Sequence, residues 1–359
     1  MKLNRSVRNI ILLAIVLLGL SIRMYNINFP SLGYHAAKEN EYISMAQEMV
    51  RTGDYITRRV YFYNAFEKEP IMNLYPQPAL VPYQILISWR LLGENMWGPR
   101  LFNVIFGVLS IFVMYHLALL LFRNTALALF SALLLSIMPL AVFFSRNIQP
   151  ESPAFFFMIL GSMFYVKFIT TMKRYDLFLG SLAFSVAWLY KFSFLIGVFP
   201  FIFCFPYIRM LKEKRAYTYA LSFFLPYLLI IFTIIWLKSV GEWEWESYVV
   251  QRVKLFEIFS PAYWKQYGRN IWWYFKGENF TPVFTSLALL GIVIAFFKRR
   301  SLIDRYIIGC TLMAIPYGMA LSDLICQHNY YQMPFLLLVC ISVSYAVLHV
   351  SRAAIKLMA

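Results

Sequence analysis

Both signs of charge are crowded into the stretch GYHAAKENEYISMA, residues 33–46, in a chain that is 61% hydrophobic. His35, Lys38, Glu39 and Glu41 all lie between positions 35 and 41. A carboxylate can take the proton of an attacking hydroxyl, and a nearby cation can stabilise a departing phosphate. The stretch follows the apolar run NIILLAIVLLGLSI, so such chemistry would take place at a membrane surface.

Later segments of the chain carry polar residues of the same kinds. They are Glu67 and Lys68 in FEKEP, Arg146 and Glu151 in RNIQPES, Lys191 in a short turn, and His328, Tyr330 and Tyr331 in QHNYYQMP. Each segment alone also fits an ordinary role: a solvated helix face, a charged turn, an ion pair, a snorkelling lysine or an aromatic belt. Ionisable groups at membrane depth are costly. Because several separate segments place such groups on the same side of the membrane, they indicate a functional site.

The composition indicates a polytopic membrane protein. Mean hydropathy is +0.63 and 14% of residues are charged, whereas soluble domains average about 25%. The net charge of +16 is expected to orient the helices through basic cytoplasmic loops, so no nucleic-acid partner is predicted. The four cysteines lack metal-ligand spacing, and no metal site is predicted from them.

Apolar runs long enough to cross a bilayer predict about ten spans. The predicted spans are 8–25, 101–122, 125–145, 152–171, 176–190, 192–208, 216–238, 281–297, 306–322 and 333–350. A further run, 70–89, is placed in the interface, because its crossing would put KEKR and KRRSLIDR outside, against the positive-inside rule. Both termini are then cytoplasmic, and segments 26–100 and 239–280 face outward. The fold class predicted is an all-α polytopic membrane protein, one domain over 1–359, with interfacial helices in the loop after the first helix and an aromatic-rich second loop.

Carboxylates, cations and hydrogen-bonding aromatic residues at the outer interface fit group transfer from a lipid-linked phosphosugar. A carboxylate would deprotonate an acceptor hydroxyl, whose oxygen would then attack the anomeric carbon. Carboxylates stabilise the positive charge that develops on the sugar, and fixed cations stabilise the departing phosphate. The chain contains neither GxxxxGK(S/T) nor GxGxxG, so a nucleotide donor is not indicated.

Taken in order, these motifs resemble those of the integral-membrane GT-C glycosyltransferases, in particular the branch with protein O-mannosyltransferases and the lipid A aminoarabinose transferase. The chain has KENEY at the family's first acidic motif, then FEKEP or YPQPAL, then GENMWGPRLFNVIFGVL with Gly93 and Arg100. RNIQPES matches the second acidic position, and HNYYQMP matches a His-x-Tyr-Tyr-x-x-Pro turn near the last helices. The resemblance covers about residues 10–350 and implies a GT-C-like bundle.

The resemblance also implies roles for the site residues. In one register Lys38 replaces the family's Asp and Glu39 is the catalytic carboxylate; in the other, H-x-x-K-x-x-E, that carboxylate is Glu41, which the spacing favours. Glu151 would orient the acceptor or stabilise the sugar. Substrate-binding roles are implied for the phosphate-facing Lys68, Arg146 and Lys191, and for His35, Lys38, Glu67, His328, Tyr330 and Tyr331. No cofactor is required, although Glu41 and Glu151 would allow a divalent metal.

We therefore predict a multi-pass plasma-membrane glycosyltransferase with a polyprenyl-phosphate sugar donor and an outward-facing active site. Its acceptor would be a membrane lipid, a glycan or a protein. Two alternatives remain open: a lipid or solute transporter or flippase, and a non-catalytic membrane assembly subunit. A transporter would place its site near the bilayer midplane on broken helices in matching halves, whereas the unusual charges here cluster at one interface. The replacement of Asp by Lys38 favours the non-catalytic alternative.

Overall fold

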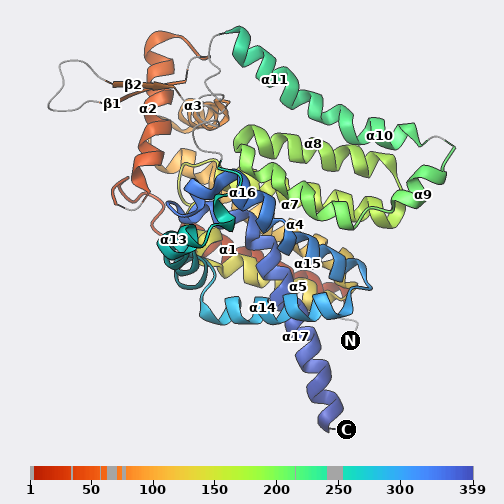
Figure 1. Ribbon diagram of the computed structural model, residues 1–359. Helices are drawn as coiled ribbons and strands as arrows, with labels where there is room; N and C mark the ends of the chain where they lie inside the picture. Colours follow the sequence, from red (N-terminus) through yellow and green to blue (C-terminus); the bar gives the residue numbers. More distant parts are fainter. Residues whose placement is uncertain are drawn as a thin grey trace.

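The structure, a computed structural model, describes residues 4–33, 35–56, 58–62, 71–74, 78–214, 216–240 and 254–358. The chain folds almost entirely into helices (Figure 1). In the N-terminal half these are α1 (Arg5–Met24), α2 (Ala36–Thr52), α3 (Leu80–Leu92), α4 (Trp97–Phe122), α5 (Thr125–Ile137), α6 (Pro139–Phe144), α7 (Glu151–Thr171) and α8 (Arg174–Tyr190). The C-terminal half has η1 (Phe192–Phe203), α9 (Tyr207–Lys212), α10 (Tyr217–Phe224), η2 (Leu225–Tyr227), α11 (Leu228–Ser239), η3 (Glu257–Phe259), α13 (Pro261–Trp273), η4 (Tyr274–Asn279), α14 (Pro282–Lys298), α15 (Leu302–Leu312), α16 (Ala314–Ile325), η5 (Asn329–Phe335) and α17 (Leu336–Met358).

Segment 26–100 contains the only strands among the described residues. Strands β1 (Arg59–Phe62) and β2 (Ile71–Leu74) pair antiparallel, with Arg59 opposite Leu74 and Phe62 opposite Ile71. No strand was predicted in this segment from the sequence. The predicted all-α class is otherwise confirmed.

Several helix limits follow from local chemistry. The Asn124 side chain accepts hydrogen bonds from the backbone N–H groups of Ala126 and Leu127, which starts α5. Pro139 follows the end of α5 and starts α6, because its ring fits the first helical position and not a helix interior. Gly53 ends α2 with φ +70°, a left-handed conformation that favours glycine.

Six helical stretches in the described part of the chain are long and apolar enough to cross a membrane. They are Arg5–Met24, Trp97–Phe122, Glu151–Thr171, Tyr217–Ser239, Leu302–Ile325 and Asn329–Met358. The pair Pro261–Asn279 and Pro282–Lys298, bent by 108°, would add a seventh. Helices lie at every predicted span, but several are short, so the count of ten stays a prediction. The multi-pass character is supported by these helices. In Figure 1 both chain termini lie at the lower right, while α2 and the hairpin lie at the upper left.

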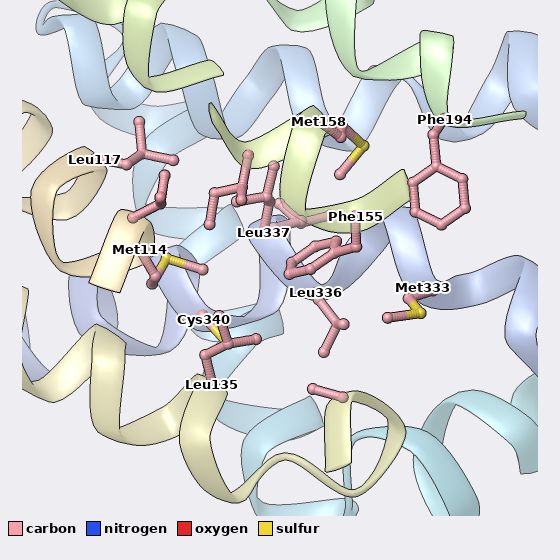
Figure 2. Close-up of a cluster of buried hydrophobic side chains, with 14 of the residues drawn as sticks. Met114, Leu117, Leu135, Phe155, Met158, Phe194, Met333, Leu336, Leu337 and Cys340 are labelled. Atoms are coloured by element: carbon pink, nitrogen blue, oxygen red, sulfur yellow. The ribbon is translucent and has the colours of Figure 1, made fainter. Parts of the chain in front are cut away.

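The interior of the bundle is a close-packed apolar core. Figure 2 shows Phe155 and Met158 of α7 beside Leu336 and Leu337 of α17, all fully or almost fully buried. Lipid tails are as apolar as leucine, so membrane helices associate through close packing, often at small residues. Gly291 of α14 shows this: an added Cβ would lie 2.1 Å from the carbonyl oxygen of Ser342 in α17. Such contacts fix how the helices are placed and therefore where their polar ends meet.

Candidate functional site

A buried ion pair joins the start of α7 to the end of α8. Glu151 is the first residue of α7, where the helix dipole favours a negative charge, and Lys191 directly follows α8. The two residues are 2% and 4% exposed, and Lys191 Nζ donates to Glu151 Oε1. Burial lowers the pKa of Lys191, although the charge of Glu151 opposes that shift.

The second carboxylate oxygen of Glu151 is the unusual feature of this pair. Oε2 is buried and has no hydrogen-bond partner among the described residues. A buried polar atom without a partner costs about 1–3 kcal/mol, so native proteins rarely keep one without a reason. The position of Oε2 is therefore where we expect a substrate group to bind.

Two tyrosines of η5 cover the ion pair. Lys191 Nζ lies 4.0 Å from the ring centroid of Tyr330 and 4.4 Å from that of Tyr331. A cation over an aromatic face is stabilised by the ring quadrupole, more strongly when it is desolvated. The Tyr317 hydroxyl of α16 donates to the carbonyl oxygen of Tyr331 at 2.7 Å, which holds η5 in place.

His35 extends the same cluster from the other end of the chain. It has φ +61° just before α2, and its ring lies 5.3 Å from Tyr330 and 6.5 Å from His328. His328 stacks in turn on Tyr330, with the ring centroids 5.0 Å apart. Burial lowers the pKa of His35, while its hydrogen bond to Asn329 and the charges of Glu151 and Glu278 raise it.

Lys38 and Glu41 lie one turn further along α2. Lys38 Nζ contacts Glu41 Oε2 at 2.8 Å, and the side chains are 36% and 15% exposed. Burial is the main cause of the lowered pKa of Lys191, and the charge of Lys38 adds to that shift. The start of α2 thus carries a more hydrated carboxylate and cation one turn beyond His35, whose ring lies against Tyr330.

Glu39 points to a different neighbour, Arg100 of α4. Arg100 Nε donates to Oε1 of Glu39 at 2.8 Å, and Arg100 Nη2 donates to Oε2 at 2.7 Å. Ser31 Oγ donates to Oε2 at 2.6 Å, and the Ile148 backbone N–H donates to Oε1 at 3.0 Å. Each oxygen of Glu39 thus accepts two hydrogen bonds.

The loop between α6 and α7 is tied to both α2 and α4. The Gln149 side chain donates to the carbonyl oxygen of His35 at 3.2 Å, and Asn103 of α4 donates to the carbonyl oxygens of Asn147 and Gln149. Ile148 binds Glu39 as described above. These bonds fix the position of the loop, and therefore of Glu151, where α7 begins.

Most of the predicted site residues meet at one end of the bundle. The structure brings together His35, Lys38, Glu41, Glu151, Lys191, His328, Tyr330 and Tyr331. Arg146 does not pair with Glu151; its Nη2 donates to the carbonyl oxygen of Tyr25, and the guanidinium lies 5.5 Å from the Phe29 ring. Glu67 and Lys68 lie outside the described residues.

Four residues that were not assigned to the site from the sequence hold its parts in place. Asn103, Gln149, Asn329 and Glu278 hold the loop and His35 through hydrogen bonds. Asn329 lies inside the HNYYQMP motif, which was the only signal for it. Glu278 follows a run of aromatic residues, and nothing in its neighbourhood distinguishes it from a surface carboxylate.

The residues present do not fit a divalent cation as they stand. In the described part of the chain, no three His, Cys, Asp or Glu side chains are grouped to hold a metal. Glu151 and Glu41 are each engaged by a lysine, and a metal would have to displace both amines.

Comparison with known proteins places this site in a known fold. The family described as dolichyl-phosphate-mannose-protein mannosyltransferase matches residues 76–236, which include Arg100, Glu151 and Lys191. The structure is similar to ArnT from Cupriavidus metallidurans bound to undecaprenyl phosphate, with TM-score 0.56, 15% identity, and coverage of 96% of this chain and 60% of that chain.

Two further similarities extend this result. Archaeal oligosaccharyltransferase AglB from Archaeoglobus fulgidus, in complex with an inhibitory peptide and a dolichol-phosphate, gives TM-score 0.57 at 12% identity, covering 97% of this chain and 51% of that chain. A protein of Aquifex aeolicus is 27% identical over 238 residues, which are 64% of this chain and 43% of that protein. The chain thus spans about half the length of the proteins it matches.

These findings confirm the resemblance drawn from the motifs. The chain has the GT-C fold shared by these structures, and residues 76–236 are similar to the mannosyltransferase family. The matched region 76–236 excludes both His35–Glu41 and the η5 tyrosines. Those parts of the candidate site rest on their contacts in the structure alone.

Proposed function

We propose that this protein moves a sugar from a polyprenyl-phosphate-linked donor to an acceptor outside the plasma membrane, with both termini cytoplasmic. The GT-C fold supports a glycosyltransferase, and the similar ArnT and AglB structures contain undecaprenyl phosphate and dolichol-phosphate. One observation carries the assignment to this site: a buried carboxylate, Glu151, with one oxygen unbonded among the described residues, beside a buried lysine and two tyrosines. The acceptor would be a lipid, a glycan or a protein.

In the proposed reaction Glu151 takes the acceptor's proton. The acceptor oxygen forms a bond to the anomeric carbon of the sugar, and the bond between that carbon and the phosphate oxygen breaks. Polyprenyl phosphate leaves with the electron pair of the broken bond, while the hydroxyl proton passes to Oε2 of Glu151. Lys191 holds Oε1 and thereby orients the carboxylate. Of the predicted catalytic carboxylates, Glu151 is favoured as the base because it has both burial and an unbonded oxygen.

Glu41 and Lys38 are proposed to act on the donor. Their greater exposure suits groups that meet a charged substrate, since a hydrated pair opens at smaller cost than a buried one. Glu41 would face the sugar as positive charge develops there, and Lys38 would approach the phosphate. Arg146 and Lys68 stay predicted phosphate ligands, and Glu67 a predicted substrate contact.

Glu39 is proposed to position the site without contacting substrate. Its oxygens already accept four hydrogen bonds, from Arg100, Ser31 and Ile148, so it has little capacity to accept a proton or to bind sugar. Its contact with Ile148 holds the loop that precedes Glu151. This role differs from the catalytic role predicted for Glu39 from sequence.

The proposal is tested by mass spectrometry of lipid-linked sugars and surface glycans in cells with and without the protein. The expected result is accumulation of a polyprenyl-phosphate sugar and loss of one glycan when the protein is removed. Glu151→Gln should reproduce that loss at normal membrane levels of the protein. Glu257→Gln, which changes a carboxylate of η3 that contacts Lys254 and Ser322, serves as the control. Unchanged glycans in Glu39→Gln, Glu41→Gln and Glu151→Gln alike would remove the proposal.

A further inference from the structure

A carboxylate outside the predicted site reaches His35 through one intervening side chain. Asn329 Nδ2 donates to Glu278 Oε2 at 3.1 Å, and Asn329 Oδ1 lies 3.0 Å from His35 Nε2. Asn329 is 5% exposed, and Glu278 and His35 are half-buried. The three residues come from η4, η5 and the start of α2, so tertiary structure alone brings them together.

The chemistry of this chain decides where the proton of His35 is. An ionised carboxylate can only accept hydrogen bonds, so Glu278 requires the amide nitrogen of Asn329 to face it. The amide oxygen of Asn329 must then face His35. An oxygen acceptor there requires a proton on Nε2, and in the neutral imidazole this leaves the lone pair on Nδ1.

Glu278 is held in a place that local electrostatics disfavour. It lies in the last turn of a helical run that ends in the π-helix η4, where the helix dipole opposes a negative charge. The chain then bends by 108° into α14. Trp273 Nε1 donates to Glu278 Oε1 at 3.2 Å, and Asn279 Nδ2 donates to the Asn329 carbonyl oxygen at 3.1 Å. A π-helical turn held against η5 in this way is typical of a functional element.

We propose that Glu278 is a positioning residue of the active site, which fixes Asn329 and thereby keeps His35 in the tautomer whose Nδ1 accepts a hydrogen bond from a substrate hydroxyl. The functional part rests on the proposed glycosyl transfer, whereas the tautomer is a property of the protein alone. His35 lies against Tyr330, whose ring also covers Lys191. A second substrate hydroxyl, next to the one that gives its proton to Glu151 Oε2, would donate to Nδ1 and so orient the substrate from this side.

The pH dependence follows from the groups that face His35. These are Glu151 of α7, Lys191 after α8, Glu278 of η4, and His328 and Tyr330 around η5. Burial lowers the pKa of His35, so the ring is neutral at neutral pH and charges only as the pH falls. Transfer that needs neutral His35 therefore rises with pH through that pKa. Loss of the Glu278 charge lowers the pKa and moves the rising limb to lower pH, whereas a new charge at position 329 moves it to higher pH.

The first experiment is nitrogen-15 NMR of histidine-labelled protein in lipid nanodiscs. The chain has only four histidines, so subtraction of the His35→Gln spectrum assigns His35. The expected result is a protonated Nε2 and a lone-pair Nδ1 in the wild type, and a mixture of the two tautomers in Glu278→Gln. A proton on Nδ1 in the wild type, or identical His35 signals in wild type and Glu278→Gln, would overturn the proposal.

The second experiment measures release of polyprenyl phosphate from polyprenyl-phosphate mannose in proteoliposomes across pH. We expect Glu278→Gln to lower the rate about tenfold, as loss of an outer partner of a functional side chain commonly does, and to shift the rising limb to lower pH. Asn329→Asp should shift the limb to higher pH, and Glu257→Gln should leave rate and limb unchanged. If the rising limb of the pH–rate profile stays in place in both Glu278→Gln and Asn329→Asp, the proposed role of His35 in transfer is overturned. An inactive wild type with the expected NMR result counts against the proposed function and leaves the tautomer assignment supported.

Discussion

Two buried ion pairs lie at the same end of the helical bundle and have opposite characters. The pair Glu39–Arg100 is saturated: both carboxylate oxygens accept two hydrogen bonds, and Arg100 also donates to the carbonyl oxygen of Ile27 at 2.8 Å. The pair Glu151–Lys191 is equally buried, yet Glu151 Oε2 has no partner among the described residues.

The difference separates structural from chemical roles better than burial does. Burying two charges costs free energy that mutual attraction only partly offsets, so complete hydrogen bonding is what makes such a pair tolerable. The Glu39–Arg100 pair meets that condition, and it ties α2, α4 and the 145–150 loop together. The Glu151–Lys191 pair does not, and an incompletely bonded carboxylate at the start of a helix is available for a ligand. Each prediction below tests this contrast.

The largest effect is expected for Glu151→Gln. The amide keeps the size of the side chain but removes the basic oxygen, so transfer should fall about 10³-fold, or about 4 kcal/mol in activation free energy. The new amide oxygen can still accept from Lys191, but the lysine loses its counter-ion, so the unfolding temperature in detergent should also fall. The measurement is polyprenyl phosphate release in proteoliposomes, and retention of more than about a tenth of the rate would show that Glu151 is not the base.

Arg100→Met should chiefly lower the stability of the protein. It leaves Glu39 as a buried charge without its main partner and frees the Ile27 carbonyl, at a cost of about 3 kcal/mol. The apparent unfolding temperature and the yield of folded protein should both fall. Lys38→Met, which removes a more exposed cation from the same helix region, is the matched control and should unfold near the wild-type temperature.

Tyr330→Leu tests the aromatic ring that covers the buried Lys191 amine. The ring lies 4.0 Å from Lys191 Nζ, and removing such a desolvated cation–π contact should cost about 1–2 kcal/mol. Transfer should fall roughly tenfold, since Lys191 orients Glu151. Tyr330→Phe keeps the ring and should retain most of the rate; equal losses in the two variants would contradict the cation–π role.

The smallest effect on stability is expected for the double variant Glu151→Gln with Lys191→Met. Removing both members of a buried pair is often neutral for stability, so the free energy of unfolding should stay within about 1 kcal/mol of the wild type. The corresponding double variant Glu39→Gln with Arg100→Met should be clearly less stable, because Ile148, Ser31 and Ile27 lose charged partners. Equal stabilities of the two doubles would erase the contrast between the pairs.

Sequence patterns located most of the site but not its internal pairing. Three motifs identified segments that the structure brings together at the site: KENEY, RNIQPES and HNYYQMP. The same patterns did not decide whether Glu39 or Glu41 is the catalytic carboxylate. Both lie within one turn of α2, and the sequence does not show which cation each of them contacts. The patterns also did not show that Glu151 pairs with Lys191, forty positions away, rather than with Arg146 of its own motif. Glu278 could not be found, since its link to His35 runs through Asn329 on a distant segment.

What the sequence determined by itself was the class of protein. Hydropathy, basic loops and ordered motifs are local properties, and they predict a helical membrane protein of the GT-C type and the segments that carry its chemistry. Which carboxylate is saturated and which keeps an open oxygen was decided only by tertiary structure. The physical reason is that a side chain's hydrogen-bonding state depends on donors from helices far apart in the chain. Those helices are placed by close packing such as that of Gly291 against Ser342.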